Sequence, residues 1–261
     1  MSFLNPATPS PRLGIDLSAL LRLRTLEPGA IEPNAAWAVQ TAEAAGADTL
    51  ILSLSAAELL RQREDIDAVK SAMIASQFDT ALSAEMIDLV GMLRPASVCF
   101  RTSAFDLENE NRQSYSDNLL ALMRRAVAQL EALSIRVIAS IDVNSTPLHL
   151  LRDAGVTSVE FDARCYTLAK PADKTAALQA LTTVVLGAKQ LGMSVHLRHC
   201  IGYCHVEQLA RLGDVEQINI GYAIVARSLV VGWQAAINEM KALLVTCHAP
   251  ARNRLDAGTI Q

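Results

Sequence analysis

The stretch Gln217-Ile218-Asn219-Ile220-Gly221-Tyr222-Ala223-Ile224-Val225-Ala226-Arg227-Ser228 reads as a short buried strand that stops at a glycine and continues directly as a helix. A glycine at such a turn lets the backbone approach a ligand closely, and the helix start behind it offers unpaired N–H groups. The pattern fits a phosphate cradle. It also fits a glycine that only makes the tight turn, and these residues alone favour the turn.

The same unit of a strand followed by a helix recurs along the chain, which has 261 residues and a mass of 28.1 kDa. The alternation predicts a single (β/α)8 TIM-type barrel with extra helices rather than an open doubly wound sheet, and such barrels have about 250 residues. We expect a loose arm at 1–12, the barrel at 13–248 and a disordered tail at 249–261. The polar segment 101–114 is long for a loop after a strand and predicts a lid. The expected strands are 13–17, 49–54, 79–83, 97–100, 136–141, 158–162, 194–198 and 217–220, and the expected helices include 56–75, 84–93, 117–133, 172–191, 205–212, 223–231 and 234–245.

Composition narrows the class of protein. The net charge is −4 and the pI about 5.7, with no basic block, so we expect no nucleic-acid partner. The longest charge-free run, 175–188, is too short to span a bilayer, and the first residues lack the apolar core of a signal peptide. Five cysteines without a secretion signal favour reduced thiols and a cytoplasmic location, with no membrane association.

Active sites of such barrels lie at the carboxyl ends of the strands. His199, which follows the seventh predicted strand, is the sharpest candidate, because imidazole exchanges protons near neutral pH. A carboxylate, a histidine and a phosphate cradle suffice for enol and imine chemistry, although any one of these side chains can instead hydrogen-bond a loop. The polar residues and glycine at or just beyond the predicted strand ends are Asp16, Ser18, Ser53, Ser55, Asp79, Arg101, Asp142, Asn144, Asp162, Arg164, Arg198, His199, Gly221 and Tyr222.

The string His199-Cys200-Ile201-Gly202-Tyr203-Cys204-His205 contains four soft or borderline metal ligands. Its spacing matches no common zinc pattern, and its second half enters a predicted helix. We therefore expect ordinary packing cysteines, no metal and no cofactor.

From about residue 13 to 245 the chain resembles the pyridoxine 5′-phosphate synthase (PdxJ) family. The resemblance implies a TIM-type barrel assembled as octamers. It also implies the condensation of 1-deoxyxylulose 5-phosphate with 3-amino-2-oxopropyl phosphate, with loss of water and one phosphate. The segments that carry it are Ala44-Ala45-Gly46-Ala47-Asp48, Glu85-Met86 to Pro95, Glu160-Phe161 with Cys165-Tyr166, and Ile218-Asn219-Ile220-Gly221 with Ala223-Ile224 and Arg227.

Carried over residue by residue, the resemblance makes His199 the family's proton donor and Asp79 the replacement for its catalytic glutamate. Other family positions have changed. Ser53 replaces a catalytic histidine and Ser55 a phosphate-binding arginine. Most of the remaining substrate-binding positions differ as well. Near the end of the chain, Cys200 replaces a glycine, and a glycine–histidine pair is replaced by Gly221 and Tyr222. Near its start, the family's first-strand Asn and Asp-His are replaced by Asp16, Ser18 and Ala19, an arginine is replaced by Glu27, and another arginine is matched by Arg24.

Three functions follow as hypotheses. The first is a pyridoxine 5′-phosphate synthase-like transferase, or a related carbonyl/imine condensation, with His199 and Asp79 moving protons. The second is a divergent paralogue with a changed substrate in specialised metabolism, and the third is a non-catalytic barrel that acts as a binding or assembly subunit. For the enzyme we expect small phosphorylated or carbonyl substrates and a homo-oligomer, an octamer by resemblance.

Overall fold

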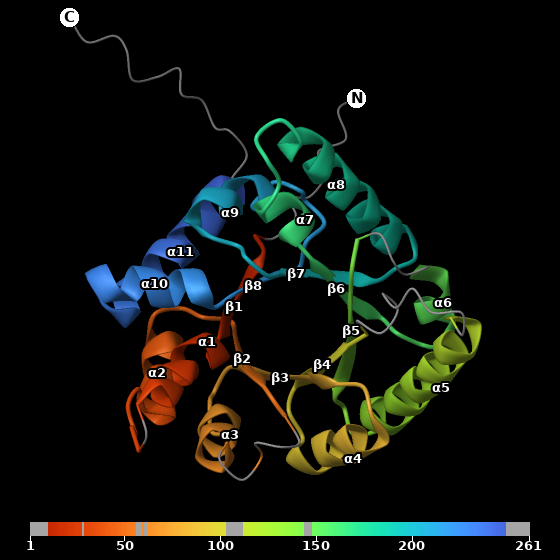
Figure 1. Cartoon of the computed structure of the whole chain (residues 1–261), viewed down its shortest axis with the longest axis horizontal. Helices are drawn as coiled ribbons and strands as arrows, with labels where there is room; N and C mark the ends of the chain where they lie inside the picture. Colours follow the sequence, from red (N-terminus) through yellow and green to blue (C-terminus); the bar gives the residue numbers. More distant parts are fainter. Residues whose placement is uncertain are drawn as a thin grey trace, which may run out of the picture.

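A computed structural model describes residues 10–27, 29–55, 59, 62–102, 112–143 and 148–248, with the side chains of 112–117 and 248 left out. Its parallel strands close into a barrel in the order β1-β2-β3-β4-β5-β6-β7-β8, which confirms the predicted fold (Figure 1). The predicted tail, most of the predicted arm, Asn144 and most of the predicted lid lie outside the described residues. The strands are β1 (Arg12–Asp16), β2 (Thr49–Ser53), β3 (Ala75–Ala81), β4 (Ser97–Arg101), β5 (Arg136–Ile141), β6 (Ser158–Asp162), β7 (Ser194–Arg198) and β8 (Gln217–Ile220).

Helices surround the barrel (Figure 1). Two of them start at side-chain caps: Asn34 accepts a hydrogen bond from the Trp37 N–H, and Ser83 accepts one from the Met86 N–H. The helices are α1 (Ser18–Leu21), the 3-10 helix η1 (Arg22–Leu26), α2 (Ala35–Ala44), α3 (Arg63–Lys70), α4 (Ala84–Leu93), α5 (Arg112–Glu131), α6 (Leu148–Asp153), α7 (Arg164–Thr167), α8 (Lys174–Gln190), α9 (Tyr203–Ala210), α10 (Tyr222–Val231) and α11 (Trp233–His248).

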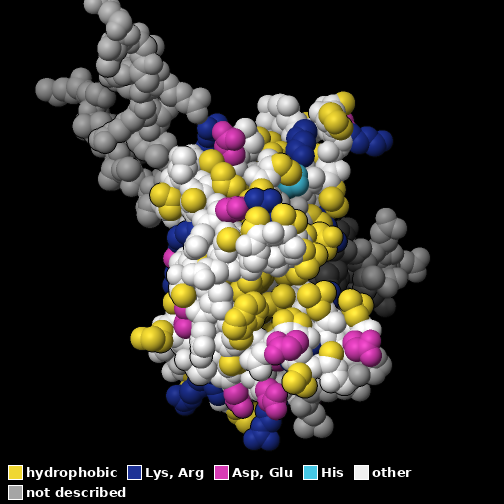
Figure 2. Space-filling view, turned by 90° about the vertical axis from the view of Figure 1, so that its left-hand side faces the viewer, with side chains coloured by type: hydrophobic (Ala, Val, Ile, Leu, Met, Phe, Trp, Pro, Cys, Tyr) yellow, Lys and Arg dark blue, Asp and Glu magenta, His cyan; other side chains and the backbone are white. Residues whose placement is uncertain are grey.

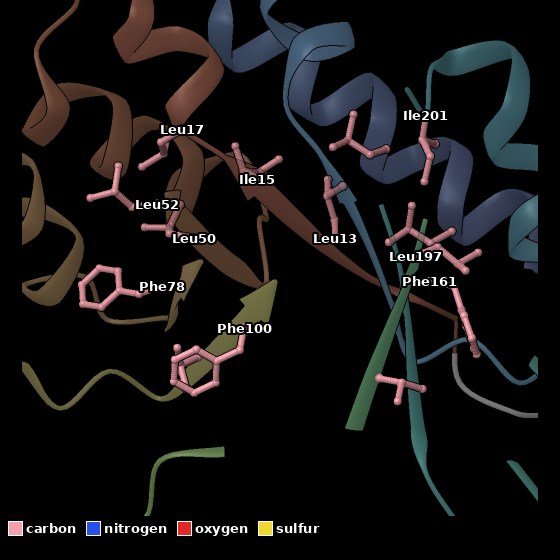
Figure 3. Close-up of a cluster of buried hydrophobic side chains, with 14 of the residues drawn as sticks. Leu13, Ile15, Leu17, Leu50, Leu52, Phe78, Phe100, Phe161, Leu197 and Ile201 are labelled. Atoms are coloured by element: carbon pink, nitrogen blue, oxygen red, sulfur yellow. The ribbon is translucent and has the colours of Figure 1, made fainter. Parts of the chain in front are cut away.

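The two faces of the strands differ in polarity. Outward-facing side chains are apolar and join the core beneath the helices, as Leu13, Leu50 and Phe78 show (Figure 3). The interior is instead unusually rich in polar groups for a fold whose centre is commonly filled by branched aliphatic residues. Hydrogen bonds satisfy many of these groups. The buried polar residues of alternate strand positions include Gln77, Asp79, Glu160, His196, Gln217 and Asn219.

The third strand differs from its prediction. It runs from Ala75 to Ala81 rather than over 79–83, and the helix expected at 56–75 is found as α3, Arg63–Lys70. The reason is that Gln77 faces the polar interior, where its amide donates to Asp79, so the strand lacks the apolar run of its neighbours. Asp79 therefore lies inside the strand, one layer below the barrel mouth.

Candidate active site

The carboxyl ends of the strands open into a cavity of about 600 Å³. Most of the residues predicted for the site line it: Asp16, Ser18, Ser53, His199, Cys200, Gly221 and Tyr222. An adjoining cavity of about 900 Å³ is lined by Arg24 and Ser55, and it shares Ser18 and Ser53 with the first. Asp79 is not part of the lining of either cavity.

Arg198, at the end of β7, organises the mouth. Its Nη2 lies 2.8 Å from Asp16 Oδ2 on β1, and its Nη1 forms an ion pair with Asp79 on β3. The same Nη1 lies 3.8 Å from Glu160 Oε1 on β6. One guanidinium thus joins carboxylates from three other strands and lies beside the carboxylate that the sequence made a catalytic candidate. The sequence placed Arg198 at a strand end but gave it no role.

Glu160 lies deeper in the interior, among hydrogen bonds that link several strands. The Cys99 thiol donates to its Oε1 at 3.4 Å, and the Asn219 amide donates to its Oε2 at 2.7 Å. Desolvation raises the pKa of Glu160 to about 7, against the lowering effect of these donors. The Asn219 Oδ1 in turn accepts from Gln217 at 2.8 Å. One signal for Glu160 was present in the sequence, because it is a charged residue within an otherwise uncharged part of a buried strand.

His199 and Cys200 form the turn after β7. Both have a left-handed backbone, with φ of 73° and 52°. Burial lowers the pKa of His199 below its ordinary 6.5, and the positive charge of Arg198 lowers it further. At neutral pH the imidazole is therefore mainly uncharged and can accept a proton from a ligand in the cavity.

Gly221 is the N-cap of α10 and has a structural reason to be glycine. A Cβ there would lie 2.9 Å from both the Cβ and the carbonyl oxygen of Asp16, so any side chain would collide with β1. The next residues, Tyr222 and Ala223, also line the cavity. Because the first N–H groups of a helix have no partner within it, this turn presents N–H groups in the cavity wall. The tight turn and the cradle are thus compatible.

The shared wall and the second cavity hold the remaining candidates. The Ser53 N–H donates to Ser18 Oγ at 2.8 Å, which fixes the serine pair between the cavities. Arg24 forms an ion pair with the buried Asp65, so its charge is already matched. The Ser55 N–H makes a long contact, 3.5 Å, with the Gln62 side-chain oxygen.

The predicted zinc-like string forms no metal-binding group. The described residues include no cluster of three or more His, Cys, Asp or Glu side chains placed to hold a metal ion. Cys200 and Cys204 are exposed free thiols, and His205 Nδ1 accepts from the Gly202 N–H at 3.2 Å.

Helices of the described chain are also too short or too polar to cross a membrane. The closed barrel, with ionisable groups gathered at the carboxyl ends of its strands, defines the class: a (β/α)8-barrel enzyme. A family model described as pyridoxal phosphate biosynthesis protein PdxJ matches residues 13–246, so the chain belongs to the PdxJ family.

One sequence relative and two solved structures are similar to the chain. The chain is 27% identical over 234 residues to the pyridoxine 5′-phosphate synthase of Parasynechococcus marenigrum (strain WH8102), which covers 89% of this chain and 93% of that protein. Tryptophan synthase from M. tuberculosis superposes with a TM-score of 0.60 at 16% identity, covering 92% of this chain and 94% of that one. The tryptophan synthase α-subunit of Pyrococcus furiosus gives 0.57 at 11% identity, covering 90% and 97%. The two structural likenesses bear on the fold alone.

Proposed function

We propose that this chain is a pyridoxine 5′-phosphate synthase-like enzyme. In this proposal it condenses 3-amino-2-oxopropyl phosphate with 1-deoxyxylulose 5-phosphate, or carries out a related carbonyl/imine condensation. The observation that carries the proposal is that one cavity is lined both by His199, with a lowered pKa, and by the start of α10 at Gly221. The relation to a curated synthase over most of both chains supports it.

In the proposed mechanism His199 moves protons at the carbons beside a carbonyl or imine. Its uncharged imidazole takes a proton, and the imidazolium then returns it to a leaving oxygen. The N–H groups of Tyr222 and Ala223 hold a phosphate by the positive end of α10. Asp16 and Arg198, paired across the mouth, orient the polar part of a substrate.

The role proposed for Asp79 depends on Arg198. Asp79 is buried and lines neither cavity, and the Arg198 guanidinium pairs with it. It reaches a substrate only when that guanidinium moves away. We therefore propose that substrate binding draws Arg198 off Asp79, and that Asp79 then serves as the second proton-transfer group.

The purified chain, given both phosphorylated substrates, is expected to release inorganic phosphate and form pyridoxine 5′-phosphate, measured by phosphate assay and chromatography. His199→Gln should lower turnover by about 100- to 10,000-fold, the usual loss for a general acid–base group. His149→Gln is the matched control, because His149 is exposed on α6 and lines neither cavity. Absence of product at high enzyme concentration would contradict the proposed synthase activity. Full turnover in both His199→Gln and Asp79→Asn would contradict the proton-transfer roles proposed for these two residues, whereas wild-type protein that binds the substrates without turning them over would favour the non-catalytic barrel.

A changed substrate is the second candidate function. Serines at 53 and 55 leave two positions of the second strand and its loop uncharged, whereas the resemblance implies a histidine and an arginine there. Thermal shift with ketose phosphates, aminoketones and their unphosphorylated analogues tests this. A ligand that stabilises the protein more than the synthase substrates do would favour it, and equal shifts for all ligands would count against it.

We also propose a homo-oligomer acting in the cytoplasm. Hydrophobic side chains gather on the face that carries α10 and α2 (Figure 2). On α10 Leu229 and Val230 are 80% and 77% exposed, and burial against a second copy would remove them from water. All five cysteines are free, which suits a reducing compartment. Light scattering coupled to size exclusion tests the oligomer: a monomer at micromolar concentration would contradict it.

A further inference from the structure

The arginines that line the two cavities fall into two groups. Arg24 is paired with Asp65, and Arg198 with Asp16 and Asp79. Arg22 and Arg101 also line the cavities, yet neither has an ion pair to any residue that the structure describes. Two guanidinium charges are therefore left without a matching carboxylate in the described part of the site.

Both arginines lie at the wall between the cavities, since each lines both of them. Arg22 opens η1, just after the short helix that follows β1. Arg101 ends β4, in register with Ala81 on β3 and Ser140 on β5, and Ser140 is part of the lining of the first cavity. The two charges thus come from the segments that follow β1 and end β4, and both lie at one wall.

Two hydroxyl groups complete this wall. Ser18 and Ser53 are its other shared lining residues, and Ser18 Oγ accepts from the Ser53 N–H. Because that contact uses a lone pair of the oxygen, the Ser18 O–H remains able to donate to a ligand. The wall therefore offers two guanidinium groups and one hydroxyl donor. This set of donors suits a doubly charged anion such as a phosphate monoester.

Acidic groups at the wall do not cancel this charge. Asp16 is the one carboxylate in the described lining of the first cavity, and Arg198 holds it. The second cavity adds Asp65, held by Arg24, and Glu27, which is exposed. Among the described lining residues, the charges without a partner at the shared wall are therefore the positive charges of Arg22 and Arg101.

We propose that Arg22 and Arg101, with the Ser18 hydroxyl, form a binding site for the phosphate monoester group of a substrate at the wall between the two cavities. This inference rests on the proposed function, in which two phosphorylated substrates meet. The start of α10 holds one phosphate and the arginine pair holds the other. Neither arginine stands at a position that the family resemblance marks as functional, and together they supply the positive charge that Ser55 lacks.

Isothermal titration with methyl phosphate, a probe that carries no carbon skeleton to recognise, tests the site directly. Arg22→Gln and Arg101→Gln should each weaken binding by about 10- to 100-fold, because each removes charge-assisted hydrogen bonds. The double variant should lose that binding event, and neutral trimethyl phosphate should not bind. Arg124→Gln is the matched control: Arg124 is exposed on α5 and lines neither cavity. Circular dichroism melts should show that all variants stay folded.

The outcomes separate this site from the proposed function. Wild-type protein that fails to bind methyl phosphate, or folded variants that bind it as the wild type does, would overturn the site. Turnover with an unchanged KM in both variants would also overturn it while leaving the synthase proposal standing. If the wild-type protein shows no synthase turnover but the arginine variants lose methyl phosphate binding, the binding site is upheld and the proposed substrates are wrong.

Discussion

Glu160 of β6 and His196 of β7 are register partners in the barrel interior, and burial shifts their pKa values in opposite directions. Desolvation raises the pKa of Glu160 to about 7 and lowers the pKa of His196 to about 4. Neither ring nitrogen of His196 has a hydrogen-bond partner among the described residues. Over the interval between those two values, both side chains are mainly uncharged, so the lower interior carries little net charge beneath the Arg198 cluster.

The raised pKa of Glu160 predicts that the wild type becomes less stable relative to Glu160→Gln as the pH rises. Because its folded pKa is above its ordinary 4.5, the native state holds an extra proton between pH 4.5 and 7, and the stabilisation is lost as pH rises through that window. The loss amounts to about 3 kcal/mol at roughly 1.4 kcal/mol per pH unit. Relative to Glu160→Gln, the wild type should therefore weaken from pH 4.5 to 7 and level off above. Urea unfolding at several pH values measures this, and a pH-independent difference would contradict it.

His196 predicts the opposite slope. Its folded pKa is below its ordinary 6.5, so the stabilisation is present above pH 6.5 and is lost as pH falls toward 4. Compared with His196→Gln, the wild type should lose about 3 kcal/mol between pH 6.5 and 4. In the wild type the two effects largely offset each other over the shared window. The stability difference between wild type and each single variant, measured in the same buffers, should therefore change with pH in opposite directions for Glu160→Gln and His196→Gln; changes in the same direction would show that one assignment is wrong.

Much of the barrel could be predicted because the outward faces of its strands carry short apolar runs that can be recognised in the sequence. Strands β5 to β8 fall on the predicted residues, as short runs whose apolar positions face the helices. Strand β3 was misplaced because Gln77 and Asp79 satisfy each other inside the barrel, a contact with no apolar signature. The helices α1 and α7 have only four residues each, too few to show a helical period.

The site was predictable as far as strand ends determine it. His199 and Gly221 reach one cavity because parallel strands end at the same rim. The pairing of Arg198 with Asp16 and Asp79 was not predictable, because it joins β7 to β1 and β3 across a closed barrel. Only the closure and register bring these distant positions within contact distance.

Removal of Arg198 is expected to destabilise the fold strongly. Its side chain is 11% exposed, and Arg198→Met would leave the 1%-exposed side chain of Asp79 without its cation. Breaking such a buried pair costs about 3–5 kcal/mol. Arg164→Met is the control, because Arg164 pairs with Asp162 at 58% exposure and its loss should cost at most about 1 kcal/mol. Urea midpoints measure both, and equal costs would contradict the role given to Arg198.

Gly221 and Gly187 predict opposite effects of the same substitution. A Cβ at 221 would meet Asp16 at 2.9 Å, so Gly221→Ala should destabilise by about 1–3 kcal/mol through overpacking. At 187, within α8, the nearest atom is Leu148 Cδ1 at 3.7 Å, an ordinary contact. Gly187→Ala should therefore stabilise by about 0.5–1 kcal/mol, the difference in helix propensity. Thermal unfolding of the two variants tests both predictions. An unchanged melting temperature in Gly221→Ala would show that the backbone of β1 at Asp16 can shift to make room for the methyl group.

The cysteines allow the cavity assignment to be tested without a substrate turnover assay. Cys200 and Cys204 are both exposed, but Cys200 alone of the two lines a cavity. Cys99 is buried, and desolvation raises the pKa of its thiol well above the usual range, so it should react only after unfolding. Iodoacetamide should therefore modify Cys200 and Cys204 in the native protein, and saturating methyl phosphate should slow modification of Cys200 but not of Cys204. Peptide mass spectrometry over a time course reads each site separately. Equal protection of both thiols would indicate a general tightening of the protein, whereas protection of Cys200 alone would place a bound anion in the first cavity, which Cys200 lines.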